Sequence, residues 1–255
     1  PRSVEEMSHS PFRLDGKRIL ITGASSGIGR AAAIECAKAG ASVILTGRNL
    51  QRLEDVLNDL PGDSHSLMAA DLTVDVEIDN LVSAADGLDG IVLCAGKGML
   101  APIQFTTTAK ARDILDTNFL SPIELLRRLL KKKRINSGAS VVGIASMGGT
   151  HFYTIGNAAY GASKAAFASY LKFAARELAL KSIRVNSVLP AMIDTPFIHG
   201  AAVDDEKHDE IAKTYPLGRY GRPEEVAYSI VYLLSDAAAW ITGTDLVIDG
   251  GRSLV

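Results

Sequence analysis

The chain has 255 residues and a formal net charge of −2, with 47% hydrophobic and 22% charged residues, an ordinary composition for a globular protein of one domain or two small ones. This neutral balance gives no reason to expect nucleic acid or an anionic membrane as a partner. Two cysteines without a Cys-x-x-Cys pair and five histidines without a His-x-x-x-His pair predict neither a disulfide framework nor a metal site.

The sequence shows neither the basic and apolar start of a secretory signal nor an apolar run of about 18 residues that could span a bilayer. We therefore expect a cytoplasmic protein. Residues 1–13 begin with a polar, aperiodic stretch and predict a flexible N-terminal tail. No linker divides residues 14–255, which predict a single domain.

Seven short β-rich runs follow one another along this domain, and most are separated by segments long enough for a helix. Several of the runs are apolar without a period of two, as strands buried on both faces require. The alternation predicts an α/β fold, a doubly wound Rossmann-type parallel sheet of seven strands with helices on both faces. The predicted strands are Arg18–Ile21, Ser42–Leu45, Ser66–Ala70, Gly90–Cys94, Ala139–Ile144, Arg184–Leu189 and Asp245–Ile248.

Ligands of such sheets bind at the carboxyl ends of the strands. Candidate binding or catalytic residues follow each of the first five predicted strands, so we expect them to meet at one edge of the sheet. In chain order they are the glycine-rich turn from Gly23 to Gly29, Arg48, Asp71, the pair Ala95 and Gly96, and Ser146.

The glycine-rich turn predicts a dinucleotide site. Gly23, Gly27 and Gly29 remove Cβ atoms where backbone must approach a pyrophosphate, and a helix that starts near Ile28 offers free N–H groups to the phosphates. A turn that only joins a strand to a helix is the plain alternative.

Arg48 decides the predicted cofactor. About 20 residues beyond the glycines an acid would bind the ribose of NAD, whereas an arginine accepts a 2′-phosphate. No Asp or Glu lies between Glu35 and Glu54, so NADP is favoured over NAD, and Arg30 can assist Arg48. The alternative for Arg48 is a solvated loop residue.

Ser146, Tyr160 and Lys164 predict the reaction. Tyr160 and Lys164 lie one turn apart in a helical segment and share a face. An ammonium beside a phenol, together with a cationic nicotinamide, lowers the phenol pKa and makes it a usable proton donor. Ser146 can donate a second hydrogen bond to a carbonyl oxygen as negative charge develops there.

These motifs resemble the short-chain dehydrogenase/reductase family over nearly the whole chain, from Lys17 to Gly251, on the side of the 3-oxoacyl-carrier-protein reductases and carbonyl reductases. The resemblance implies that Asn118 completes the catalytic set by holding a water beside the lysine, that Asp71 contacts the adenine, and that the segment from Pro190 to Thr195 packs on the nicotinamide. It further implies a homotetramer, or a homodimer, built on helices around 105–133 and 157–180. The remaining implied cofactor contacts are Ser25, Ser26, Ile28, Leu72, Ala95, Gly96, Tyr160, Lys164, Ile193 and Thr195.

The chain departs from the family pattern at two places. Leu93 and Cys94 replace two asparagines after the fourth strand, which puts hydrogen bonds at that strand end in question, and Ala191 replaces a glycine and narrows the nicotinamide pocket.

The expected function is therefore an NADP(H)-dependent oxidoreductase that moves a hydride between nicotinamide and a ketone or secondary alcohol, 3-oxoacyl or another small carbonyl. A protein that binds NADP on the same fold without turnover, as a sensor or scaffold, is the alternative. A sugar-nucleotide epimerase needs a larger C-terminal domain than this length leaves. The sequence does not choose a substrate, although residues 192–216 predict a lid over a partly apolar pocket.

Overall fold

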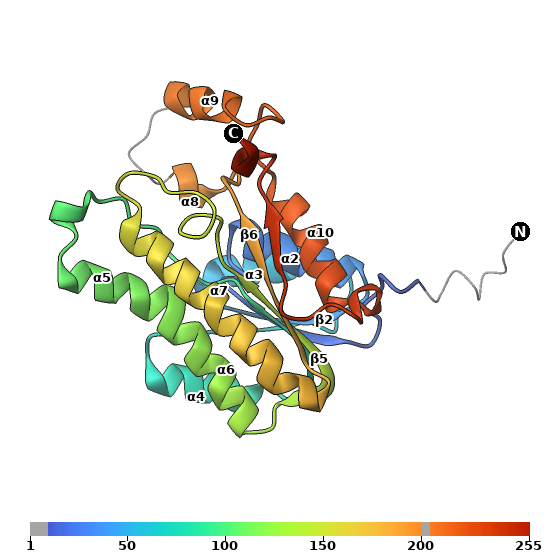
Figure 1. Cartoon of the computed structure of the whole chain (residues 1–255). Helices are drawn as coiled ribbons and strands as arrows, with labels where there is room; N and C mark the ends of the chain where they lie inside the picture. Colours follow the sequence, from blue (N-terminus) through green and yellow to red (C-terminus); the bar gives the residue numbers. More distant parts are fainter. Residues whose placement is uncertain (1–9, 200–204) are drawn as a thin grey trace, which may run out of the picture.

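The fold was analysed on a computed structural model that describes residues 10–199 and 205–255 (Figure 1). The predicted tail, 1–13, lies outside the described residues up to residue 9, and residues 200–204 of the predicted lid lie outside them too. The described end of the tail packs on the protein. The Phe12 ring lies 6.1 Å from the Tyr232 ring, and Ala237 N donates to Pro11 O at 2.9 Å.

A seven-stranded sheet in the order β3-β2-β1-β4-β5-β6-β7 forms the centre of the molecule. Every neighbouring pair is parallel, and the order reverses between β1 and β4, which confirms the predicted doubly wound sheet. The strands are β1 Arg18–Thr22, β2 Ser42–Gly47, β3 Ser66–Ala69, β4 Leu88–Leu93, β5 Ile135–Ile144, β6 Arg184–Pro190 and β7 Asp245–Ile248.

Helices connect the strands and cover both faces of the sheet (Figure 1). The α-helices are α2 Gly27–Lys38, α3 Leu50–Asp59, α4 Asp75–Ala84, α5 Thr108–Leu115, α6 Ser121–Lys131, α7 Ala158–Leu178, α8 Pro196–His199, α9 Asp205–Lys213 and α10 Pro223–Leu234. Short turns are the 3₁₀ segments η1 Ile103–Phe105, η3 Ala179–Lys181, η4 Asp236–Ala238 and η5 Arg252–Leu254, and the π-helical turn η2 Asp116–Leu120.

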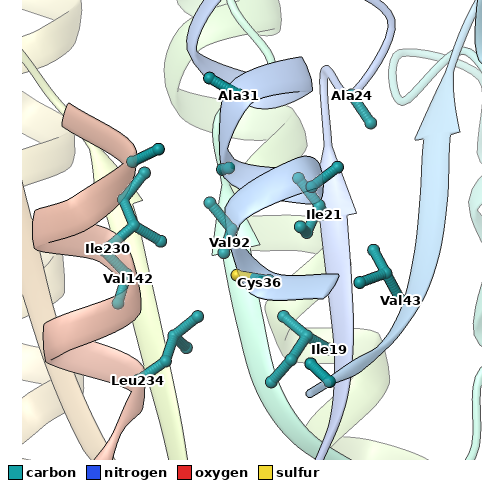
Figure 2. Packing of buried hydrophobic residues seen from close by; sticks show 14 of the residues in the cluster. Ile19, Ile21, Ala24, Ala31, Cys36, Val43, Val92, Val142, Ile230 and Leu234 are labelled. Carbon is teal, nitrogen blue, oxygen red and sulfur yellow. The ribbon is translucent and has the colours of Figure 1, made fainter. Parts of the chain in front are cut away.

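Two apolar cores lie on the two faces of the sheet. The first joins α2, α3 and α10 to the strands, and Figure 2 shows Cys36 of α2 beside Ile21 and Val92, with Ile230 of α10 across from them. The second joins α4, α6 and α7 to the other face, with Leu126 and Phe167 among its buried side chains. Burial on both faces explains why the central strands are continuously apolar.

Two strands begin earlier than the sequence predicts. β5 starts at Ile135 and not at Ala139, and β4 starts at Leu88 and not at Gly90. Leu88 pairs with Ile135, after which the register shifts before Gly90 pairs with Ser140. The added part of β5 is exposed at Asn136, Ser137 and Gly138, so the apolar pattern that identifies a buried strand does not reach it.

Candidate active site

The carboxyl edge of the sheet brings the predicted site residues together. The glycine-rich turn follows β1, Arg48 follows β2, and Ser146 lies two residues beyond the end of β5. Because all strands run in one direction, these positions share one edge, as expected from the sequence.

The glycine-rich turn packs so closely against neighbouring backbone that its glycines have no room for a side chain. A Cβ on Gly29 would lie 2.1 Å from the carbonyl oxygen of Gly23, and one on Gly23 would lie 2.9 Å from Ala95 Cα. Gly27, at the first position of α2, faces the Thr195 side chain, whose Cγ2 lies 3.2 Å from a Cβ built on Gly27. The turn thus touches both the segment after β4 and the segment after β6, and these close contacts leave no room for a side chain at Gly23 or Gly29.

Thr22 supplies the hydrogen-bond acceptor at the end of β4, where Cys94 stands in place of an asparagine. Its Oγ1 accepts hydrogen bonds from Cys94 N at 2.9 Å and from Ala95 N at 3.0 Å, and it donates to Val92 O at 3.3 Å. The strand end is therefore satisfied from the neighbouring strand without asparagines. Burial raises the pKa of the Cys94 thiol to about 11, so Cys94 is a small neutral side chain at neutral pH and not a nucleophile.

Arg48 is exposed and makes no hydrogen bond or ion pair with any residue that the structure describes. Hydrogen bonds from Thr73 lower the pKa of Asp71, and the positive charges of Arg48 and Lys97 add to this effect. Arg48 therefore stands close enough to influence the acid at the next strand end.

Two other residues predicted to contact the nucleotide already have partners within the protein. Asp71 accepts from Thr73 N at 2.9 Å and Thr73 Oγ1 at 2.7 Å, which closes a turn before α4. Arg30 pairs with Asp59 at 2.8 Å on the surface, and its assistance to Arg48 stays a prediction. Leu72 is buried.

A groove of about 400 Å³ opens at the N-terminus of α2. Ser25, Ser26 and Gly27 line one wall, and Arg52 of α3 and Pro196 of α8 line others. Three predicted cofactor residues therefore line open space next to free N–H groups of a helix start.

Tyr160 and Ser146 meet as predicted. Tyr160 lies in the first turn of α7, and its hydroxyl is close enough to the Ser146 side chain for Ser146 to lower the Tyr160 pKa. Ser146 Oγ in turn accepts from Gly148 N at 3.0 Å, which orients the hydroxyl.

The pKa of Tyr160 differs from the expectation. Burial raises it, and the interaction with the Ser146 side chain opposes that rise. The Lys164 ammonium does not contribute to the shift of the Tyr160 pKa. Lys164 Nζ instead donates to Ile144 O at 2.7 Å, so the side groups of this chain alone do not lower the phenol pKa.

Lys164 is a buried ammonium, with 5% of the residue exposed. Burial lowers its pKa to about 8, because the charged form loses hydration in the interior. Its Nζ lies 5.9 Å from the Phe167 ring centre. A base with this pKa exchanges protons near neutral pH.

Asn118 lies in the π-helical turn η2 and is fully buried. Its side chain accepts from Lys97 N at 2.9 Å, donates to Lys97 O at 2.9 Å and donates to Ser163 Oγ at 3.1 Å. A Cβ on Gly96 would lie 3.2 Å from Asn118 Oδ1 and 3.3 Å from Lys164 Nζ. The structure therefore brings Asn118 next to Lys164, with its amide committed to the segment after β4.

The segment after β6 is held at the site by main-chain bonds. Met147 N donates to Pro190 O at 3.2 Å, and Ala191 N donates to Ile248 O at 2.9 Å. Ile193 forms an isolated bridge with Gly221 and is buried, as is Thr195. The predicted nicotinamide segment thus adjoins the residue after Ser146.

Phe197 is a site residue that the sequence reasoning placed only in the lid. Its ring centre lies 6.1 Å from that of Tyr160, and a Cβ on Gly98 would lie 2.9 Å from Phe197 Cζ. The signal available in the sequence was the apolar pair after Pro196.

His151 Nδ1 contacts Thr150 Oγ1 at 3.0 Å and the residue is exposed.

Within residues 10–199 and 205–255 there is no cluster of three or more His, Cys, Asp or Glu side chains able to hold a metal ion. No helix in that part of the chain is long and apolar enough to cross a membrane.

Comparison with known proteins identifies the class. A family model described as Enoyl-(Acyl carrier protein) reductase matches residues 23–253. The chain is 35% identical over 248 residues to a 3-oxoacyl-(acyl-carrier-protein) reductase FabG of Rickettsia prowazekii, covering 95% of this chain and 99% of that protein. It is 34% identical over 249 residues to a D-threitol dehydrogenase of Mycolicibacterium smegmatis, covering 95% of both chains.

A solved structure from Beutenbergia cavernae, described as a candidate NAD(P)-dependent gluconate 5-dehydrogenase with NADP bound at low occupancy, superposes with a TM-score of 0.89 at 31% identity, covering 96% of this chain and 100% of that one. The chain belongs to the short-chain dehydrogenase/reductase family. It is an oxidoreductase of that family that acts on a carbonyl or alcohol group.

Proposed function

We propose that the chain is an NADP(H)-dependent oxidoreductase that reduces a ketone, or oxidises the matching secondary alcohol, with Tyr160 as general acid or base. The observation that carries the proposal is the placement of the Tyr160 hydroxyl beside the Ser146 side chain, which lowers the Tyr160 pKa, at the strand edge that also carries the glycine-rich turn. The groove at the N-terminus of α2, lined by Ser25, Ser26 and Gly27, supports cofactor binding at this edge, because the free N–H groups of a helix start can bind phosphate. Nicotinamide, when bound, supplies or accepts the hydride.

The protein's own groups handle the proton and the oxygen. Ser146 donates a hydrogen bond to the substrate oxygen, and Tyr160 gives its hydroxyl proton to that oxygen as charge develops. Lys164, with its pKa lowered to about 8 by burial, returns a proton to Tyr160 after each reduction and regains one from solvent. Asn118 acts as a positioning residue, since its amide fastens Lys97 to Ser163 beside Lys164.

The proposed NADP preference is supported by Arg48, which is exposed and free of any ion pair with a described residue. A guanidinium in this position can take a 2′-phosphate as a charge-assisted fork. The Beutenbergia relative with bound NADP is consistent with this preference. Contacts from Ser25, Ser26 and Thr195 are part of the proposal.

We propose further that the chain forms a homotetramer or homodimer through the helical face around 105–133 and 157–180. Large apolar side chains on this face are exposed, including Phe173 at 68%, Phe105 at 60% and Leu120 at 47%. The C-terminal Leu254, exposed at 83%, is a candidate for burial in the assembly. Light scattering of the purified protein at several concentrations tests this, and a monomer at every concentration would refute it.

The function is tested by NADPH oxidation on a panel of ketones, including 3-oxoacyl thioesters and ketoses because the relatives named above act on different substrates. Wild type is expected to turn over at least one of them. Tyr160→Phe is expected to retain NADPH binding and lose turnover about 100- to 10,000-fold. Tight NADPH binding without turnover of any ketone would favour a sensor or scaffold.

A further inference from the structure

Arg252, in the C-terminal turn η5, lies between two aromatic rings from different parts of the chain. Its guanidinium carbon is 4.5 Å from the ring centre of Phe152 and 5.7 Å from that of Tyr215. Attraction between a cation and the ring faces favours this placement. The guanidinium therefore has a defined position although it is only half-buried.

Both rings are connected to the active site by short hydrogen-bonded paths. Phe152 N donates to Met147 O at 3.1 Å, within the loop that begins at Ser146. The Tyr215 hydroxyl accepts from Met192 N at 3.2 Å, in the segment that follows β6. Figure 1 shows the C-terminus beside α8 and α9, at the same edge of the sheet. Arg252 thus lies at the edge of the sheet that carries the site, next to the segments that follow β5 and β6.

The turn that carries Arg252 is fixed by its own contacts. Asp249 accepts from Gly251 N at 2.9 Å and from Ser253 N at 2.8 Å. Gly251 has φ of +84°, and a Cβ there would lie 2.9 Å from Pro216 Cγ. Since only glycine fits this contact, the turn presses closely on the residue after Tyr215.

Arg252 has no carboxylate partner among the described residues. Its hydrogen bond goes to the carbonyl oxygen of Thr214 at 3.4 Å, and the nearby Asp249 is committed to the turn. By contrast, Arg219 pairs with Glu225 at 2.6 Å. A guanidinium has five N–H donors, so most of those on Arg252 remain available to a ligand.

We propose that Arg252 is a specificity-determining residue that binds an anionic oxygen group of the substrate, a carboxylate or a phosphate, away from the reacting carbonyl. The inference rests on the proposed carbonyl reduction and narrows its substrate class. A planar, weakly hydrated cation that is stacked on aromatic rings is suited to bidentate recognition of such groups. Phe152 and Tyr215 hold it there, and the Thr214 carbonyl sets its rotation.

The test compares matched substrates that differ only in the anionic group. Methyl ketones with a terminal carboxylate at increasing chain length are paired with their methyl esters, and dihydroxyacetone phosphate is paired with dihydroxyacetone. The two series distinguish a carboxylate from a phosphate. Steady-state kinetics are measured for wild type, Arg252→Met, Arg252→Lys and the exposed Lys181→Met, which removes an equal charge at the opposite edge of the sheet.

Wild type is expected to prefer one anionic series. Arg252→Met should raise KM for that series roughly 10- to 100-fold, with kcat little changed and the neutral partners unaffected. Arg252→Lys should fall between, because it keeps the charge and loses the planar fork. Lys181→Met should behave as wild type, and thermal unfolding should show that the Arg252 variants are folded.

Equal KM increases for charged and neutral partners, or no preference for an anion in wild type, would overturn the proposal. Binding gives a readout that does not depend on turnover. Calorimetry with non-reacting carboxylates, organic phosphates and their esters, in the presence of NADP, measures the same preference. If no ketone is reduced but the anion preference depends on Arg252, the proposed reaction fails and the anion site stands.

Discussion

The glycine-rich turn and the catalytic face of α7 lie at the same edge of the sheet, yet they are built in opposite ways. The turn works by the lack of side chains, because a Cβ on Gly29 would lie 2.1 Å from Gly23 O. The catalytic face works through buried polar groups, since Lys164 is 5% exposed and Asn118 is fully buried.

The two halves of the site are therefore sensitive to different changes. The turn is intolerant of added atoms and is insensitive to pH, since no titratable group forms its tight contacts. The α7 face keeps a buried charge, which costs stability in the interior and responds to pH. Substitutions on the two sides should therefore fail in distinguishable ways.

The largest effect is expected from Gly29→Ala. Its methyl group must displace the Gly23 backbone, so the free energy of unfolding should fall by about 4 kcal/mol or more, in the range of severe core disruption. Gly47→Ala is the matched control, because a Cβ there meets nothing closer than 3.6 Å. Urea unfolding measures both. Equal stability of the two variants would show that the turn is not closed by steric fit.

Lys164→Met tests the cost of the buried charge on α7. The Lys164 pKa is lowered from 10.5 to about 8 in the folded protein, so the unfolded chain binds more protons between these values. Wild-type stability therefore gains from this group as pH rises from 8 to 10.5. Below pH 8 the buried ammonium costs about 3 kcal/mol relative to the neutral form, and methionine removes that cost.

The variant's stability relative to wild type should thus decline by about 3 kcal/mol between pH 7 and pH 10.5. Chemical unfolding at several pH values measures the difference, with Lys181→Met as an exposed control that should show little change with pH. A constant difference for Lys164→Met would mean that its pKa is not depressed.

Arg48→Asp tests whether the nucleotide side depends on one charge. Loss of a charge-assisted fork and introduction of a carboxylate should weaken NADP binding roughly 10- to 100-fold and improve NAD binding through the ribose hydroxyls. Fluorescence titration with both cofactors measures this. An unchanged ratio of the two affinities would remove Arg48 from cofactor recognition.

The smallest effect is expected at Thr22. Thr22→Val keeps the shape but removes the acceptor of Cys94 N and Ala95 N, so stability should fall by about 1 to 2 kcal/mol. Thr22→Ser should restore most of it, since it retains the hydroxyl. Thermal unfolding distinguishes these outcomes, and a neutral Thr22→Val would show that this strand end needs no side-chain cap.

Much of the fold could be predicted because its signals are local. Apolar runs identified all seven strands, and the helix that carries Tyr160 and Lys164 follows from residues within one turn of each other. The polar start of β5 at Asn136 was missed, because an exposed strand segment carries no apolar pattern. The π-helical turn at Asn118 also leaves no such pattern.

Features that depend on distant parts of the chain could not be predicted. Arg30 pairs with Asp59 across two helices, which no local pattern indicates. The raised pKa of Tyr160 follows from its burial and from where the Lys164 ammonium points, at Ile144 O. The position of Arg252 depends on rings 100 and 37 residues earlier in the chain.

The central claim is that this edge of the sheet passes a hydride between nicotinamide and a carbonyl carbon while Tyr160 supplies the proton. Its most direct test is a single turnover with NADPH deuterated at the transferable position of the ring, followed by mass spectrometry of the alcohol. We expect deuterium on the carbinol carbon with wild type and at most a trace with Tyr160→Phe. NADPH that binds but leaves no deuterium in any product, or equal transfer by both proteins, would contradict it.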